Sequence, residues 1–71
     1  MTWEEQQVLE FLAGQPDTLF SRREIARKSV KRSFFEENPN WINPVLETLV
    51  NKKEVVQDAA GYYGINKDKR Y

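Results

Sequence analysis

Two capping boxes constrain the fold of this chain most, because each one marks the residue at which a helix begins. Thr2 and Glu5 form the first box, and Ser21 and Glu24 form the second. In such a pair the hydroxyl and the carboxylate satisfy N–H groups that the first turn of a helix leaves free. Each box is followed by residues with a helical apolar face, and Gly14 is a typical helix end. The helices predicted from these signals span about residues 3–13 and 22–32.

The second half of the chain predicts one more helix and a hairpin. Apolar residues recur at helical spacing from Trp41 through Leu46 to Val50, which predicts a third helix over about 41–52. Two strand-like runs then flank a short turn in which Gly61 can adopt a positive φ, so we predict a β-hairpin over about 54–66.

The expected fold is therefore a single domain over residues 1–71, mainly α with a small β-hairpin (α+β), with three helices. The short apolar segment Thr18 to Phe20 lies between the first two helices, and we expect it to form one strand bridge. The basic end of the chain, residues 67–71, is expected to fray.

The composition argues against enzymes and metal proteins. The chain of 71 residues contains no Cys and no His, so it has no thiolate or imidazole for a nucleophile, a base or a zinc site. It carries 11 Lys/Arg and 11 Asp/Glu, a net charge of zero. We expect no catalytic activity, no cofactor and no bound metal.

The apolar pattern argues against a membrane protein. No apolar run approaches the ~18 residues of a membrane span. The first residues lack the basic and then apolar pattern of a signal peptide. A cytoplasmic protein is the expectation, and the absence of Cys agrees with it.

The order helix, short strand, helix, helix, hairpin resembles the winged-helix variant of the helix-turn-helix family. The residues that carry the resemblance are the capped segment Ser21 to Ala26, the third-helix spacing of Ile42, Leu46 and Leu49, the strand at Val55-Val56 and the returning strand Gly61 to Ile65. Two features depart from the family pattern. The link between the second and third helices is long, and Lys53 stands where many members have glycine.

The resemblance implies that the third helix enters the major groove of double-stranded DNA and that the hairpin is the wing. Residues 22–32 carry six positive charges and one negative, so they are the expected phosphate-binding element. The predicted phosphate contacts are Arg22, Arg23, Arg27, Lys28 and Lys31.

The groove-facing candidates are polar residues on the outer face of the third helix. Asn43 and Asn51 have the side chains that read adenine edges, and Glu47 could accept a hydrogen bond from cytosine. Thr48 could contact a base or a phosphate, and Tyr62 is the outward-facing candidate of the wing.

A protein-binding winged helix is the alternative. The net charge is zero, the wing tip at residues 58–61 has no cation, and the third helix has no Arg or Lys before Lys52. All three features fit a protein partner in place of DNA. No separate dimerisation helix is visible in the sequence, so a monomer is expected in either case.

Overall fold

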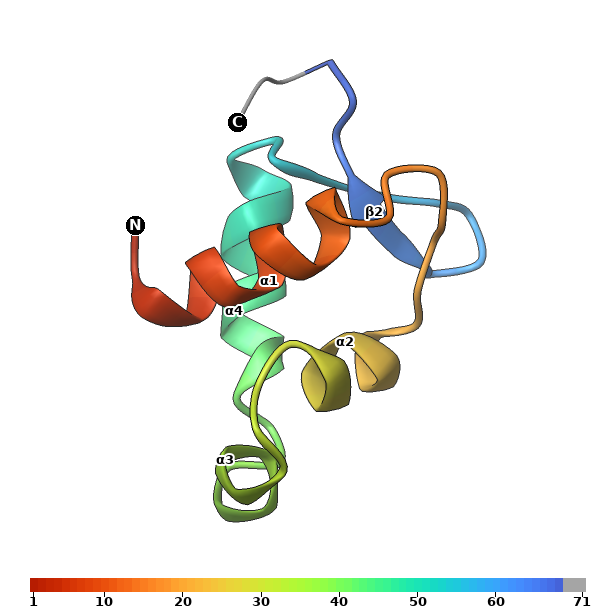
Figure 1. The fold of residues 1–71 in the computed structure, drawn as a ribbon. Coiled ribbons are helices and arrows are strands. Elements are labelled where there is room, and N and C mark those ends of the chain that lie inside the picture. The colour runs from red at the N-terminus through yellow and green to blue at the C-terminus, as the bar shows by residue number, and fades with distance from the viewer. Residues whose placement is uncertain (69–71) are drawn as a thin grey trace.

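The computed structural model describes residues 1–68, which form a mainly helical α+β structure. Within those residues there are four helices and a two-stranded antiparallel hairpin (Figure 1). The elements in chain order are α1 (Trp3–Ala13), α2 (Arg22–Lys28), α3 (Arg32–Glu37), α4 (Ile42–Asn51), β1 (Val55–Gln57) and β2 (Tyr63–Ile65).

Both capping boxes form as the sequence predicts. The Thr2 hydroxyl accepts the Glu5 N–H at 3.2 Å, and the Glu5 carboxylate accepts the Thr2 N–H at 2.9 Å. The Ser21 hydroxyl accepts the Glu24 N–H at 3.2 Å, and the Glu24 carboxylate accepts the Ser21 N–H at 3.4 Å. Each box orients the first turn of its helix, so α1 and α2 begin where expected.

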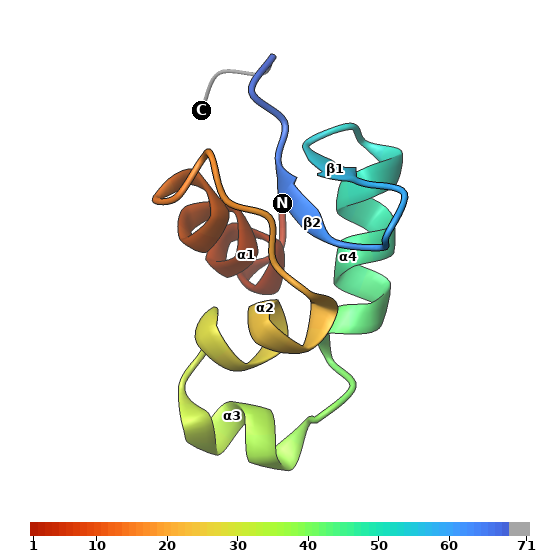
Figure 2. The same ribbon diagram turned by 90° about the vertical axis from the view of Figure 1, so that its right-hand side faces the viewer.

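The expectation of three helices, with the second running from 22 to 32, is wrong. Helix α2 ends at Lys28, and a separate helix α3 occupies the link. Figure 2 shows α3 beyond α2, at the end of the molecule farthest from the hairpin. Lys31 has extended backbone angles (φ −65°, ψ 149°) that turn the chain between them. An ion pair of 2.7 Å between Arg32 and Glu36, one turn apart, supports the short helix.

The break between α2 and α3 brings Phe34 between two tryptophans. The Phe34 ring meets the Trp3 ring at 5.4 Å and the Trp41 ring at 5.7 Å between centroids, both edge to face. The Trp41 indole N–H also donates to the Ala26 carbonyl at 3.1 Å. These contacts join α1, α2, α3 and the start of α4, and such aromatic pairs add stability beyond their buried area.

The core lies where α1, α2 and α4 meet the hairpin. Strand β1 pairs with β2 in the register Val55↔Ile65 and Gln57↔Tyr63. Phe20 forms the predicted strand bridge with Tyr63, through two backbone hydrogen bonds of 2.7 and 2.8 Å. The buried apolar side chains are Val8, Leu9, Leu12, Phe20, Ile25, Ala26, Ile42, Leu46, Leu49, Val55, Tyr63 and Ile65.

No helix within residues 1–68 combines the length and the apolar character needed to cross a bilayer. The predicted basic tail lies mostly at residues 69–71, outside the described residues. Of its remaining part, the Lys67 ammonium pairs with the Asp17 carboxylate.

Lys53 ends α4 in a conformation that favours glycine. Its φ is 62°, and it is the one non-glycine residue with positive φ within the described chain. The Lys53 N–H donates to the Val50 carbonyl and the Glu54 N–H to the Leu49 carbonyl, both at 3.0 Å. This pair of bonds is a Schellman motif, which usually has glycine at the left-handed position. Lys53 therefore holds a left-handed backbone conformation that is more strained for lysine than for glycine.

We expect Lys53→Gly to raise the free energy of unfolding by about 1 kcal/mol, because glycine adopts positive φ without the Cβ clash. Urea denaturation followed by tryptophan fluorescence measures the change. Lys53→Ala is the matched control: it removes the same charge but keeps the Cβ, so it should change stability little. An equal gain in both variants would assign the effect to charge and contradict the backbone explanation.

Candidate functional site

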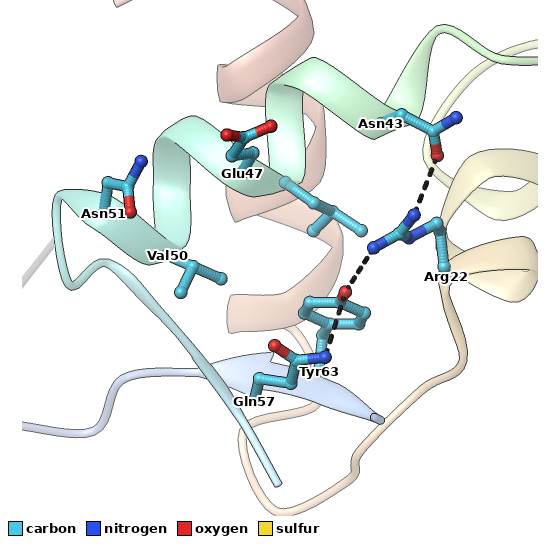
Figure 3. Close-up of a pocket in the computed structure, with 8 residues that line it drawn as sticks. Arg22, Asn43, Glu47, Val50, Asn51, Gln57 and Tyr63 are labelled. Atoms are coloured by element: carbon cyan, nitrogen blue, oxygen red, sulfur yellow. Dashed lines mark hydrogen bonds between the residues drawn. The ribbon is translucent and has the colours of Figure 1, made fainter. Parts of the chain in front are cut away.

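A polar stripe on α4 lines a groove between this helix and the hairpin. Asn43, Glu47 and Asn51 follow one another at four-residue spacing, so they share one face of the helix. All three are exposed, and the groove that they line has a volume of about 280 Å³ (Figure 3). Three of the four predicted groove-facing residues are therefore brought together.

The fourth predicted groove residue, Thr48, lies outside this groove. It is exposed, but its hydroxyl donates to the Pro44 carbonyl one turn back, at 2.9 Å. Such a bond inside a helix occupies the hydroxyl proton. Thr48 can still offer its oxygen as an acceptor, but it does so from the neighbouring side of the helix.

The floor and the far wall of the groove are formed by residues that the sequence analysis did not predict as site residues. Leu46 and Val50 of α4 supply apolar surface, and Gln57 of β1 and Tyr63 of β2 supply the opposite wall. One signal for Gln57 was present: it shares a face with buried Val55, where a polar side chain is unexpected. The other three looked like ordinary core residues.

Arg22 is held at the end of this groove by two acceptors. Its Nη2 donates to the Tyr63 hydroxyl at 2.7 Å, and its Nη1 donates to Asn43 Oδ1 at 3.2 Å (Figure 3). The guanidinium lies 5.7 Å from the centre of the Tyr63 ring, and Gln57 Nε2 donates to the same hydroxyl at 3.2 Å. Arg22, one of the predicted phosphate contacts, joins α2, α4 and the hairpin. It is exposed on its outer side.

Arg23 and Arg27 lie on the α3 side of α2. Arg23 lines a second groove, of about 410 Å³, together with Arg22, Asn40 and Asn43. Arg27 lines a third hollow beside Phe35 and the Arg32–Glu36 ion pair. Both side chains are exposed.

The remaining two predicted phosphate ligands lie elsewhere. Lys28 points toward other neighbours: its ammonium is 3.8 Å from the Glu24 carboxylate and 5.9 Å from the Phe20 ring centre. Lys31 precedes α3. The five predicted cations therefore do not form one continuous face, because α2 ends before Lys31.

The two adjacent tyrosines of the hairpin separate as the alternation of a strand predicts. Tyr63 is buried and Tyr62 is 49% exposed. The Tyr62 N–H donates to the Asp58 carboxylate at 2.8 Å, and the Ala60 N–H donates to the same oxygen at 3.0 Å. Gly61 has the expected positive φ, 89°. The tip of the hairpin is thus an Asp-stabilised turn with the exposed Tyr62 side chain beside it.

Comparison with protein-family models, with curated proteins and with solved structures finds no match for this chain. Its function must therefore be inferred from its own residues. Among residues 1–68 there is no cluster of three or more acidic, Cys or His side chains that could hold a metal ion. The α4 groove combines amide, carboxylate and guanidinium groups, which form hydrogen bonds and ion pairs.

Proposed function

We propose that this chain is a winged-helix module that binds double-stranded DNA, with α4 as the recognition helix and the β1–β2 hairpin as the wing. The order of elements supports this fold, as does the isolated bridge that pairs Phe20, between α1 and α2, with Tyr63 of β2. Helix α3 is then an insertion in the link between the second and third helices of the family, and it accounts for the length of that link.

One observation carries the proposal: cations of α2 lie beside the first residue of the exposed polar stripe on α4. Arg22 and Arg23 line one groove together with Asn43, the first residue of the stripe. DNA-binding modules need such a combination, because phosphate contacts position the protein and polar side chains reach the base edges. The length of the stripe from Asn43 to Asn51 is about 12 Å at 1.5 Å per residue, which spans about three or four base pairs.

The phosphate contacts are assigned to Arg23 and Arg27, whose guanidinium groups are exposed. Lys28, which lies beside Glu24, and Lys31, which precedes α3, add only to the local positive field. With a net charge of zero, the chain depends on this local field and not on its overall charge. We therefore expect a modest affinity that falls as the salt concentration rises.

An NMR titration of the amide signals with a mixed-sequence DNA duplex tests the proposal. At low salt we expect shifts confined to α2, the outer side of α4 and the hairpin. At about 200 mM salt these shifts should fade, because counterion release drives phosphate binding. No shifts at low salt would contradict DNA binding.

Replacing Arg23 and Arg27 together by alanine should weaken binding to all DNA sequences alike. The slope of log K against log salt should fall by about 2, since each lost phosphate contact contributes about 1. The control, Lys67→Ala, removes a positive charge that is paired with Asp17 and lies outside the hollow lined by Arg27. An unchanged slope in the first variant, or the same loss in both, would remove Arg23 and Arg27 from the interface.

A protein partner is the second candidate function, and Glu47 is the observation that favours it. Its carboxylate lies in the middle of the α4 stripe, where DNA phosphates would repel it. A pull-down that retains one stoichiometric protein and no nucleic acid would support this alternative. The DNA titration separates the two functions, because a protein-binding module would show no salt-dependent shifts with a duplex.

A further inference from the structure

The contact between Arg22 and Asn43 restricts what the recognition helix can read. Arg22 Nη1 lies 3.2 Å from Asn43 Oδ1. A guanidinium has N–H donors and no acceptor, so the Asn43 amide must turn its oxygen toward Arg22. Its NH₂ group then points away from Arg22, as Figure 3 shows.

A free asparagine reads adenine with both ends of its amide, because its oxygen accepts from N6 and its nitrogen donates to N7. In Asn43 the oxygen faces a positively charged donor. The amino group of an adenine placed there would meet the guanidinium, which repels a second donor. The adenine readout expected from the sequence is therefore disfavoured at Asn43.

Arg22 itself remains able to donate. Two of its N–H groups are used, by Asn43 and by the Tyr63 hydroxyl, and its outer side is exposed. Tyr63 is buried and its hydroxyl also receives Gln57 Nε2, so this anchor is fixed. The guanidinium is thus held beside α4, whose own sequence has no Arg or Lys before Lys52.

We propose that Arg22 and Asn43 act as one donor-only pair that selects guanine in the major groove. Guanine presents two acceptors there, O6 and N7, whereas adenine presents one acceptor and one donor. Arg22 is then a specificity-determining residue supplied to α4 from α2, and it is not one of the phosphate ligands. This inference rests on the proposed DNA binding.

Selection from a library of DNA duplexes tests the role of the Arg22–Asn43 pair. About ten central base pairs are randomised, because a segment of this length covers the reach of one recognition helix. The wild-type chain should enrich guanine at one position. Asn43→Ala removes the amide, and Arg22→Lys keeps the charge but loses the planar fork that holds Asn43 and Tyr63 together. Each variant should lower the preference for guanine over adenine at that position about tenfold. Gln15→Ala, which removes an exposed amide from the α1–α2 loop, should keep it.

A second measurement uses the wild-type chain alone, so it does not depend on how the variants fold. Replacing the selected guanine by 7-deazaguanine removes the N7 acceptor and should weaken binding about tenfold. Three results would overturn the guanine assignment but leave the proposed DNA binding intact: enrichment of adenine, equal binding of all sequences, or no effect of 7-deazaguanine. Absence of binding to any duplex at low salt would overturn the proposed function and the pair with it.

Discussion

Leu49→Ala is expected to lower the free energy of unfolding by about 3 kcal/mol. Leu49 lies on the inner face of α4 with none of its surface exposed, within the cluster that joins α1, α2 and the hairpin. Truncating such a leucine costs the transfer free energy of the lost atoms and leaves a cavity. At roughly 0.05–0.15 kcal/mol per residue, a chain of 71 residues has a stability of about 4–11 kcal/mol. The variant should therefore lose a large part of its stability.

Urea denaturation followed by circular dichroism measures this loss. Leu19→Ala is the matched control, because Leu19 is 44% exposed and its truncation opens no core cavity. We expect the control to lose less than about 1 kcal/mol. Similar losses for the two leucines would contradict the position of α4 against the core. Leu46 is equally buried but lines the groove, so its truncation would also disturb the candidate site.

Glu5→Ala is expected to lower the free energy of unfolding by about 2 kcal/mol at neutral pH. The Glu5 side chain is buried and holds two partners: the Thr2 N–H at 2.9 Å and the Lys52 ammonium at 3.2 Å. The variant therefore removes the capping box of α1 and the ion pair that joins α1 to the end of α4. Glu4→Ala, which changes the neighbouring carboxylate, should cost much less. Equal losses would mean that the effect comes from charge in the first turn alone.

The same carboxylate makes the stability depend on pH in the acid range. The hydrogen bond from the Thr2 backbone, with help from Lys52, holds the pKa of Glu5 below its ordinary value of 4.5, although burial opposes this. A lowered pKa in the folded state means that this stabilisation is complete above pH 4.5 and is lost as the pH falls through the folded pKa. Glu5→Gln should therefore lose less stability than the wild-type chain between about pH 5 and pH 3.

Asp17 is the necessary comparison in this experiment, because Lys67 lowers its pKa as well. Asp17 is exposed, so water screens its ion pair and its share of the acid loss is expected to be small. Asp17→Asn should leave most of the acid dependence in place. If Asp17→Asn removed more of the dependence than Glu5→Gln, the buried Glu5 ion pair would not be the main source.

The sequence by itself determined the features whose causes lie within a few residues. Both capping boxes join residues three apart, so the starts of α1 and α2 could be predicted. The turn around Gly61 and the opposite exposure of Tyr62 and Tyr63 follow from local turn geometry and strand alternation. The polar stripe of α4 could also be predicted, because four-residue spacing defines one helix face.

Only the tertiary structure decided the end of α2, the presence of α3 and the role of Arg22. The break between α2 and α3 accompanies the contacts of Phe34 with Trp3 and Trp41. No local sequence signal predicts these contacts, because Trp3 is far from Phe34 and Trp41 in the chain. Arg22 donates to Tyr63, 41 residues away along the chain, and to Asn43, 21 residues away. The spacing of basic residues along one helix cannot show that one of them is hydrogen-bonded to a strand much later in the sequence. The local pattern therefore marked Arg22 as one basic residue among six, and the packing of α2 against α4 and β2 gave it separate partners.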